Sequence, residues 1–294
     1  MIQNNGFTLI NPQTGNLAFK IYHLEKDNPF DHIQRLNYYS LIWIQKGNGT
    51  LKVDFSEYSF KDNMLLSFSP YQPFMLQTKS NIIGVVIHFH PDFFCIYKHH
   101  KEVACDGVLF NNIYNSPTVQ IEDKDVASLQ IIVKQLEEEM KRPALAQYEL
   151  LFSYLKIFLI TASRLKTEQQ PLKKNTDNTN EAPFILQNLK NYIETHYKTK
   201  HSASEYATML AITPKALAKL TKAHYNKTLT DLISERIIIE AKRELYLTNK
   251  TIKEIAFELG YTDEYYFSRF FKKNVEISPQ LYRETVGFDK ASSG

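Results

Sequence analysis

Residues 251–273 read TIKEIAFELGYTDEYYFSRFFKK, and this stretch decides the fold of the C-terminal part of the chain. Thr251 and Glu254 have the S/T-x-x-E spacing of a capping box, in which the two residues satisfy free backbone N–H groups where a helix starts. Ser202 and Glu205 repeat that spacing 49 residues earlier. A capped helix that occurs twice at a fixed offset indicates two copies of one structural motif.

The residues after each capping box continue the repeat. Ala207 and Ala256 are small, as is needed where the second helix of such a motif approaches closely. A short turn follows, and we expect Thr213 and Thr262 to begin the next helix, with Pro214 suited to its first turn. A helix, a tight turn and a basic second helix form a helix-turn-helix, whose second helix enters the major groove of DNA. Beyond the turn the offset becomes 50, which pairs Leu217 with Phe267, Lys219 with Arg269, and Lys222 with Lys272.

The residues between the two motifs predict one connecting helix. Its apolar positions, at helical spacing, are Leu232, Ile233, Ile237, Ala241 and Leu245. Such a helix would hold the two reader helices, the second helix of each motif, at a fixed separation. To enter successive grooves on one face of DNA, the readers must lie about 34 Å apart, one turn of the duplex. The alternative, an ordinary helical bundle with accidental caps, explains neither the repeat nor the basic residues on both readers.

The charge distribution agrees with a polyanionic partner for the C-terminal part. Residues 183–294 carry 17 Lys and Arg against 13 Asp and Glu, whereas residues 1–166 carry 16 of each. A surplus of this size also occurs on an ordinary solvated face, so the charge supports DNA binding without establishing it.

A set of residues from 236 to 283 carries a resemblance to a known family. The matching residues are Arg236, Ala241, Leu245, Ile255, Ala256, Gly260, Tyr261, Asp263, Tyr266, Phe267, Ser268, Arg269, Phe271, Lys272, Lys273, Ser278, Pro279, Tyr282 and Arg283. In type and spacing they closely resemble the signature of the AraC/XylS family, and the resemblance covers roughly residues 184–285. It implies a bipartite domain that binds double-stranded promoter DNA in a sequence-specific way. It also implies a transcription regulator, usually an activator that contacts RNA polymerase.

Two positions depart from the family pattern. Glu276 stands where the family commonly has Gly, and if that position needs a positive φ, Glu costs about 1 kcal/mol there. Asn226 holds the equivalent place in the first motif and tolerates such a conformation. Thr221 replaces the usual Phe, which suggests looser packing of the first motif.

The family geometry predicts which side chains face DNA. They are Lys215, Ala218, Lys219 and Lys222 on the first reader, and Glu264, Tyr265, Arg269 and Lys273 on the second. Arg269 is suited to a bidentate contact with guanine, whereas Lys219 and Lys222 are suited to phosphates. Glu264 could accept a hydrogen bond from cytosine N4, or its negative charge near the phosphates could disfavour binding. Tyr265 could contact a thymine methyl group. For each of these residues the alternative is a solvated surface side chain.

The N-terminal part has the sequence pattern of β-strands followed by two helices. Short aromatic or β-branched runs at residues 38–45, 50–55, 64–68 and 82–90 alternate with turn residues and predict a small barrel or sandwich. Residues 122–166 change to helical periodicity and predict a helical hairpin that packs on these strands. Its more apolar second helix, residues 150–165, suggests a homodimer interface, and the alternative is an internal core. The polar segment 167–182 predicts a flexible linker.

Together these features predict an α+β protein of two domains. Residues 1–166 form an N-terminal cupin-like β-barrel with a helical hairpin, as the family resemblance implies. Residues 183–294 form a C-terminal all-α domain of two helix-turn-helix motifs joined by a linker helix.

The family resemblance also implies an effector site in the barrel. Candidate residues for a small organic effector are Arg35, Tyr39, Trp43 and His88, although the same residues would serve equally well as barrel core. His88 and His90 share one side of a strand, but no carboxylate has a diagnostic spacing, so we expect no metal and no cofactor. Two enzymatic alternatives are a cupin dioxygenase or isomerase and a DNA-alkyl transferase. The first lacks its histidine pattern and the second its cysteine cluster, so we expect no catalytic residues. A regulator whose N-terminal domain binds no ligand is a third alternative.

Other features bear on location. No run of 18 apolar residues occurs, no secretory signal stands at the N-terminus, and the two cysteines, Cys95 and Cys105, form no CxxC pair. We therefore expect a reduced, cytoplasmic protein without a membrane partner.

Overall fold

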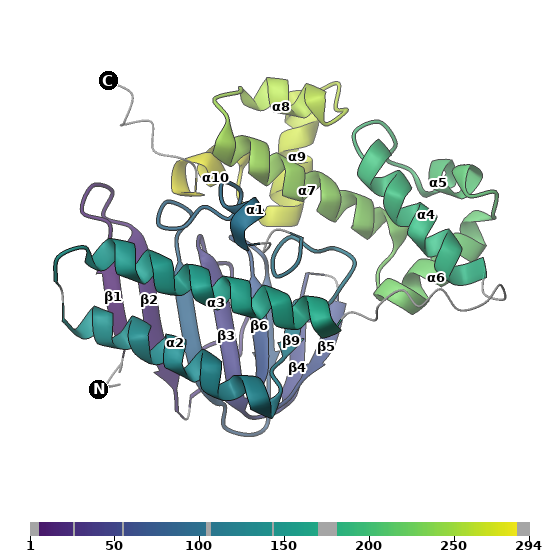
Figure 1. Cartoon of the computed structure of the whole chain (residues 1–294). Coiled ribbons are helices and arrows are strands. Elements are labelled where there is room, and N and C mark those ends of the chain that lie inside the picture. Colours follow the sequence, from purple (N-terminus) through teal and green to yellow (C-terminus); the bar gives the residue numbers. More distant parts are fainter. Residues whose placement is uncertain are drawn as a thin grey trace. The chain divides into compact units, whose positions relative to one another are not determined.

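The computed structural model describes residues 6–25, 27–54, 56–103, 107–142, 144–169 and 181–286 (Figure 1). These residues form two compact units. The N-terminal unit holds the described residues up to Asn112 and from Ser116 to position 169, and the C-terminal unit holds Ile113–Asn115 with residues 181–286. Within these described ranges, no helix has the length and apolar character that a membrane crossing requires.

The N-terminal unit contains two antiparallel sheets. The larger sheet has the order β1 (Gly6–Ile10), β2 (Leu17–Leu24), β8 (Ile83–Phe89), β3 (Tyr39–Lys46), β6 (Met64–Phe68) and β9 (Thr118–Gln120). The smaller sheet has the order β5 (Ser56–Phe60), β4 (Gly49–Val53) and β7 (Phe74–Gln77). A one-turn helix, α1 (His100–Val103), follows β8.

Both faces of the larger sheet are covered. The helices α2 (Asp123–Lys141) and α3 (Gln147–Gln169) lie across one face (Figure 1). Strand alternation sends Leu41 and Ile87 into the core under these helices. It sends Ile42 and Val86 into a second core, which is shared with the smaller sheet. The helical hairpin therefore lies where its sequence period predicts.

The N-terminal strands do not close into the expected barrel. The chain passes from β3 in the larger sheet to β4 in the smaller one, and among the described residues only the isolated bridge between Gln34 and Phe74 lies outside the two ladders. A closed barrel needs a continuous hydrogen-bonded ladder around its circumference. The architecture is therefore two sheets that enclose a core, and the cupin-like description stays a prediction.

The ends of the predicted linker, residues 167–182, are helical. α3 continues to Gln169, and α4 (Glu181–His196) already begins at Glu181. Residues 170–180 lie outside the described residues.

The C-terminal unit is helical. Its further helices are α5 (Ala203–Met209), α6 (Pro214–Tyr225), α7 (Leu229–Leu247), α8 (Ile252–Glu258), α9 (Glu264–Val275) and α10 (Pro279–Val286). The helices α5 and α6 form the first helix-turn-helix, α8 and α9 form the second, and α7 is the connecting helix (Figure 1).

Both predicted capping boxes are present. The Ser202 side chain accepts from the backbone N–H of Glu205, and Thr251 accepts from that of Glu254, with the reciprocal bonds also made. A third box, formed by Thr228 and Asp231, starts α7. Local sequence therefore fixes where three of these helices begin.

The two turns are equivalent up to one inserted residue. Ala211 and Gly260 both have positive φ, 55° and 84°, and the backbone N–H groups of the next residues, Ile212 and Tyr261, both bond back to the alanine carbonyl five residues earlier. Thr213 then caps α6, as expected, but Asp263 caps α9, so the expected helix start at Thr262 is wrong. Thr262 is the extra residue that changes the offset from 49 to 50. Threonine and aspartate are both good N-caps, so the sequence alone did not distinguish them.

Candidate DNA-binding interface

The reader helix α9 has one buried stripe and one exposed stripe. Phe267, Phe271 and Val275 are buried and fix the orientation of the helix. Arg269 lies exposed on the opposite side, and Tyr265 beside it has 75% of its surface exposed. Lys273, one turn further along, is exposed as well. α9 therefore presents a cationic and aromatic face to solvent.

The reader helix α6 has the same arrangement. Leu217 and Thr221 are buried. The predicted contact residues Lys215, Ala218, Lys219 and Lys222 are all exposed. The Lys222 ammonium also donates to the carbonyl oxygen of Asn226 at 3.2 Å, so this lysine contributes to the C-terminal cap of its own helix.

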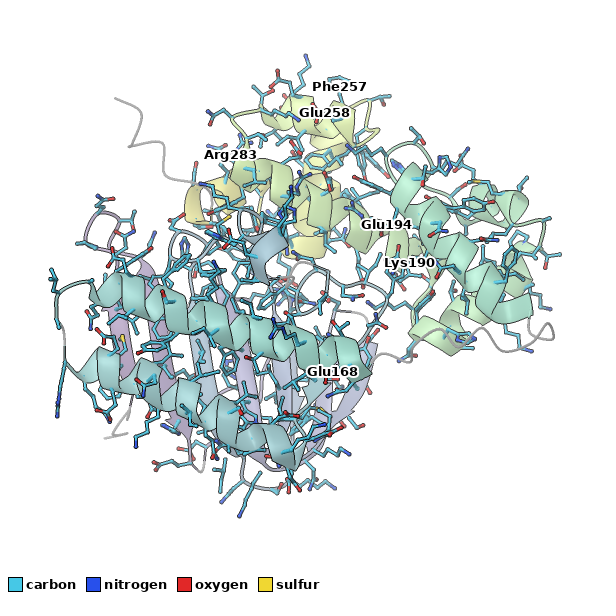
Figure 2. The ribbon with its side chains drawn as sticks, in the orientation of Figure 1. Glu168, Lys190, Glu194, Phe257, Glu258 and Arg283 are labelled. Carbon is cyan, nitrogen blue, oxygen red and sulfur yellow. The ribbon has the colours of Figure 1, made fainter. Side chains whose placement is uncertain are left out.

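Among the described residues, the exposed cations of the reader helices form no ion pair with a carboxylate. Within residues 181–286, no ion pair involves Lys215, Lys219 or Arg269. Most acidic side chains of the C-terminal unit are engaged elsewhere, in helix caps or in ion pairs. Glu194 and Glu258, labelled in Figure 2, pair with Arg236 and Lys250. The positive charge on the reader faces is therefore not neutralised from within the unit, which favours an anionic partner there.

Glu264 does not belong to the exposed face of α9. It stands seven residues before Phe271, so it continues the buried stripe two turns earlier, and it is partly buried. Tyr266 and Lys272, three residues to either side of Arg269, are exposed and were missing from the predicted set. A period of 3.6 residues centred on Arg269 would have found both of them.

The helix α7 holds the two motifs in one unit. It has 19 residues, which corresponds to a length of roughly 28 Å. Ala241 and Leu245, two of its predicted apolar positions, are fully buried. A rigid spacer of this length is of the same order as one turn of DNA, about 34 Å.

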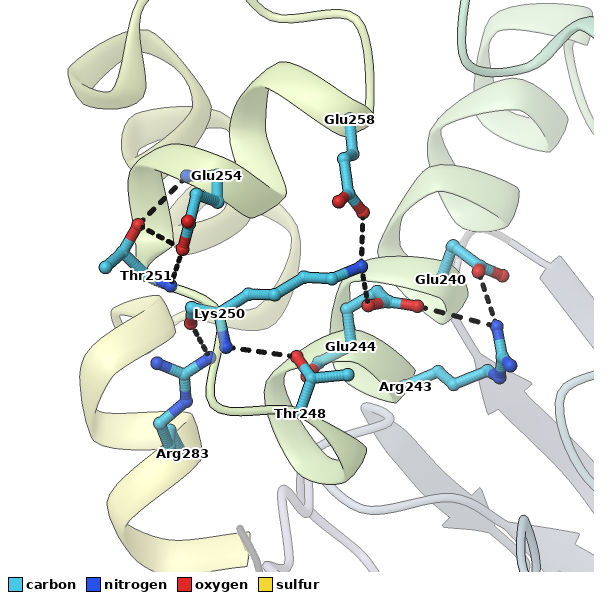
Figure 3. Close-up of polar contacts among 9 residues, drawn as sticks. All are labelled: Glu240, Arg243, Glu244, Thr248, Lys250, Thr251, Glu254, Glu258 and Arg283. Atoms are coloured by element: carbon cyan, nitrogen blue, oxygen red, sulfur yellow. Dashed lines mark hydrogen bonds and ion pairs between the residues drawn. The ribbon is translucent and has the colours of Figure 1, made fainter.

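A polar clamp closes the joint between α7 and α8 (Figure 3). The Lys250 ammonium contacts Glu244 on α7 at 2.8 Å and Glu258 on α8 at 2.6 Å. Arg283 on α10 donates to the carbonyl oxygen of Lys250 at 2.6 Å and to that of Leu245 at 3.2 Å. These bonds satisfy carbonyl groups at and beyond the end of α7, so they hold the second motif on the connecting helix.

The four candidate effector residues do not form one site. Tyr39 stacks on Phe89 at 5.1 Å in the core below the helices α2 and α3, and Trp43 belongs to the same core. His88 lies on the opposite face of the larger sheet, because it is one residue away from Phe89 in the strand. Arg35 precedes β3 and is partly exposed. The predicted grouping fails because sequence alternation does not tell which face each core occupies.

His88 is the centre of a buried polar cluster. Its Nδ1 atom lies 2.9 Å from the Ser40 hydroxyl, its Nε2 atom lies 3.3 Å from the Tyr22 hydroxyl, and the Tyr38 ring lies 4.6 Å from its own. The Lys20 ammonium lies 4.9 Å from the centre of the Tyr22 ring. Burial, with a smaller effect of Lys20, lowers the pKa of His88 to about 3, so the imidazole is neutral at physiological pH.

No metal-binding cluster of three or more His, Cys, Asp or Glu residues occurs among the described residues. His90 instead lies 3.2 Å from Asp92, and His99 lies near Glu102.

Comparison with known proteins places the strongest similarity in the C-terminal unit. A helix-turn-helix domain model matches residues 206–285. The HTH-type transcriptional activator Btr of Bacillus subtilis is 37% identical over 84 residues, which cover 29% of this chain and 16% of Btr. The regulatory protein SoxS of Escherichia coli is 29% identical over 102 residues, which cover 35% of this chain and 95% of SoxS. The solved structure of ToxT from Vibrio cholerae aligns over 97% of this chain and 98% of its own, with 18% identity and a TM-score of 0.39.

The similarity covers only part of several relatives. The chain spans 16% of Btr and 46% of the raffinose operon regulator RafR of Pediococcus pentosaceus. Within the matched region, the structure has both helix-turn-helix motifs and an exposed cationic face on each reader. The C-terminal unit is therefore a helix-turn-helix domain similar to those of transcriptional regulators of the AraC/XylS family.

Proposed function

We propose that the chain reads two successive major grooves of promoter DNA, one with α6 and one with α9. The observation that carries this proposal is the pair of equivalent, exposed and unneutralised faces centred on Lys219 and Arg269. They lie 50 residues apart in sequence, at the same place in two copies of one motif. Two readers on one connecting helix bind cooperatively, because the second contact is intramolecular once the first is made.

The side chains divide into base and phosphate contacts. Arg269 carries a planar guanidinium that matches the two acceptors of guanine, O6 and N7. Lys215, Lys219, Lys222, Lys272 and Lys273 supply positive charge for phosphates and hold the register of the complex. Tyr265 and Tyr266 offer ring edges to thymine methyl groups. The backbone N–H groups of Tyr265 and Tyr266 already donate to the Asp263 carboxylate. These two N–H groups are therefore poorly available as hydrogen-bond donors to a DNA phosphate.

Selection of random DNA duplexes by the full-length protein tests the proposal. We expect a motif of two short blocks about one helical turn apart. Arg269→Ala should relax one block and weaken binding by about 1–3 kcal/mol. Lys219→Ala should weaken binding to all sequences and reduce the salt slope by about 1. Lys253→Ala, which removes an exposed lysine of α8 from outside the reader faces, is the matched control. A folded protein that binds no duplex at low salt contradicts the proposal.

We infer that the bound protein activates transcription by contacting RNA polymerase, as the names of relatives such as Btr suggest. Transcription in vitro from a template with the selected motif upstream of a weak promoter should rise when the protein is added. A fall in transcript on the same template would instead make the protein a repressor.

We further propose that the N-terminal unit binds a small organic effector beside the His88 cluster. The support is chemical, because a neutral imidazole, a serine hydroxyl and two tyrosines next to an apolar core suit a small molecule with a few polar groups. A thermal-shift screen of small metabolites tests this, because a ligand that binds only the folded state raises the melting temperature. The shift should be lost in Ser40→Ala and retained in Ser80→Ala, which changes an exposed loop residue. A library without any stabilising compound, or a shift that Ser40→Ala leaves unchanged, would count against this site.

A further inference from the structure

Three residues from the N-terminal half of the sequence, Ile113–Asn115, belong to the C-terminal unit. The Tyr114 hydroxyl donates a hydrogen bond of 2.8 Å to Glu194 on α4. The Lys190 ammonium, one turn earlier on the same helix, lies 5.0 Å from the centre of the Tyr114 ring (Figure 2 labels Lys190 and Glu194). The Tyr225 ring also lies against this ring, at 5.8 Å between centroids. Tyr225 is the last residue of the first reader helix, α6.

Ile113 makes a second contact two residues beyond the end of α6. Its carbonyl oxygen accepts a hydrogen bond of 3.3 Å from the Lys227 ammonium. Lys227 is 5% exposed and forms an ion pair of 2.7 Å with Glu235 on α7. A buried ammonium needs further acceptors besides its counterion, and the Ile113 carbonyl provides one of them.

Glu194 extends the contact of Tyr114 to the connecting helix. One carboxylate oxygen of Glu194 accepts from Tyr114 and the other accepts from Arg236 on α7 at 2.8 Å. Arg236 continues to Glu240 at 3.1 Å, and its guanidinium lies 4.1 Å from the centre of the Tyr197 ring. Burial and the Glu194 carboxylate raise the pKa of Tyr114, so its hydroxyl keeps the proton that it donates.

The second reader has no equivalent of these contacts. With the offset of 50, Tyr225 corresponds to Val275 and Lys227 corresponds to Ile277. Valine has no aromatic ring to replace that of Tyr225, and isoleucine has no side-chain donor to replace the Lys227 ammonium. The segment Ile113–Asn115 therefore acts on one motif and not on the other.

We propose that Ile113 and Tyr114 are positioning residues for the first reader helix, α6. They contact both sides of Asn226, the left-handed cap at which α6 ends, and tie it to α4 and α7. The inference rests on the proposed reading of DNA by α6 and α9, and it adds that one of these readers depends on residues far outside the C-terminal sequence.

The test compares full-length Tyr114→Phe and Tyr114→Ala with the native chain. Tyr154→Phe is the matched control, because it removes a tyrosine hydroxyl that contacts Gln135 in the N-terminal unit. Affinity is measured for the selected two-block duplex and for two duplexes in which one block or the other is scrambled. Fluorescence of Trp43, the single tryptophan, and circular dichroism establish that each variant is folded.

We expect Tyr114→Phe to lower affinity for the two-block duplex by about three- to tenfold, and Tyr114→Ala to lower it further. On the duplex whose α9 block is scrambled, both variants should still bind more weakly than the native chain. On the duplex whose α6 block is scrambled, the variants and the native chain should bind equally.

Two results would overturn the inference while leaving the proposed function intact. One is a two-block motif with unchanged affinity in Tyr114→Phe and Tyr114→Ala. The other is an equal loss of affinity on both single-block duplexes. Failure of the native chain to select any motif would overturn the proposed function, and this inference with it.

Discussion

Asn226 and Glu276 end the two reader helices in the same left-handed conformation, with φ angles of 55° and 69°. Each donates its backbone N–H to the carbonyl four residues earlier, Lys222 in α6 and Lys272 in α9. Asparagine occupies such a conformation readily, whereas glutamate, with its Cβ close to the following carbonyl, is strained in it. The sequence pattern of the family, with glycine at the second position, anticipates this conformation.

Glu276→Gly should therefore stabilise the chain. Glycine removes the strain in the folded state, but its greater backbone freedom also stabilises the unfolded chain. The first effect is larger, so we expect a net increase of about 0.5–1 kcal/mol in the free energy of unfolding. Asn226→Gly should change it by less. Chemical denaturation followed by circular dichroism measures both variants, and an unchanged or lower midpoint for Glu276→Gly would contradict the strain argument.

Arg283→Met should destabilise the second helix-turn-helix. It removes the hydrogen bond to the carbonyl of Lys250, which Figure 3 shows, and the one to the carbonyl of Leu245, and we expect a loss of about 2 kcal/mol. The control is Lys52→Met, whose ion pair with Glu57 is exposed on both sides and contributes little. Equal losses for the two variants would show that the clamp adds nothing beyond surface charge.

His88 makes the stability of the chain depend on pH. The folded state keeps His88 neutral down to about pH 3, whereas the unfolded chain binds a proton below about pH 6.5. The unfolded state then holds more protons, so stability falls as the pH drops from about 6.5 towards 3, by at most ~1.4 kcal/mol per pH unit. His88→Gln should flatten this part of the stability curve, and His32→Gln, which changes an exposed histidine, should not. Denaturation midpoints of the native chain and both variants, measured between pH 7 and 4, test this prediction. If stability changes with pH in the same way in His88→Gln and in the native chain, the pH dependence does not come from His88.

The exposed side of the α2–α3 hairpin should mediate dimerisation. Ile157 is 48% exposed on α3, and Leu150 and Ile131 are exposed on the same hairpin. Ile157→Lys should raise the dissociation constant of a homodimer tenfold or more, roughly the effect of 1.4 kcal/mol or above, because it places a charge in an apolar contact. Ile10→Lys is the control, since Ile10 is 47% exposed but lies on β1. Sedimentation velocity measures the association. A native chain that sediments as a monomer at micromolar concentration, or equal behaviour of the two variants, would rule out this interface.

Much of the C-terminal unit follows from rules that act over a few residues. The capping residues Ser202 and Thr251 start their helices where the sequence predicts, because a cap involves only the next three residues. The apolar positions of the family signature, such as Phe267 and Phe271, are the buried stripe of α9. Glu264 is only partly exposed, because a shift of one residue rotates a helical position by about 100°, and its contact with DNA stays a prediction.

The sequence by itself determined the helix-turn-helix repeat, the connecting helix and the cationic readers, because capping, helical period and side-chain charge are local properties. Tertiary structure alone decided that Trp43 and His88 lie on opposite faces of one sheet. Both faces are buried, so no polar side marks either of them in the sequence. It alone also decided that Tyr114 joins Glu194, 80 residues away in the sequence, since no short-range rule relates residues at that distance.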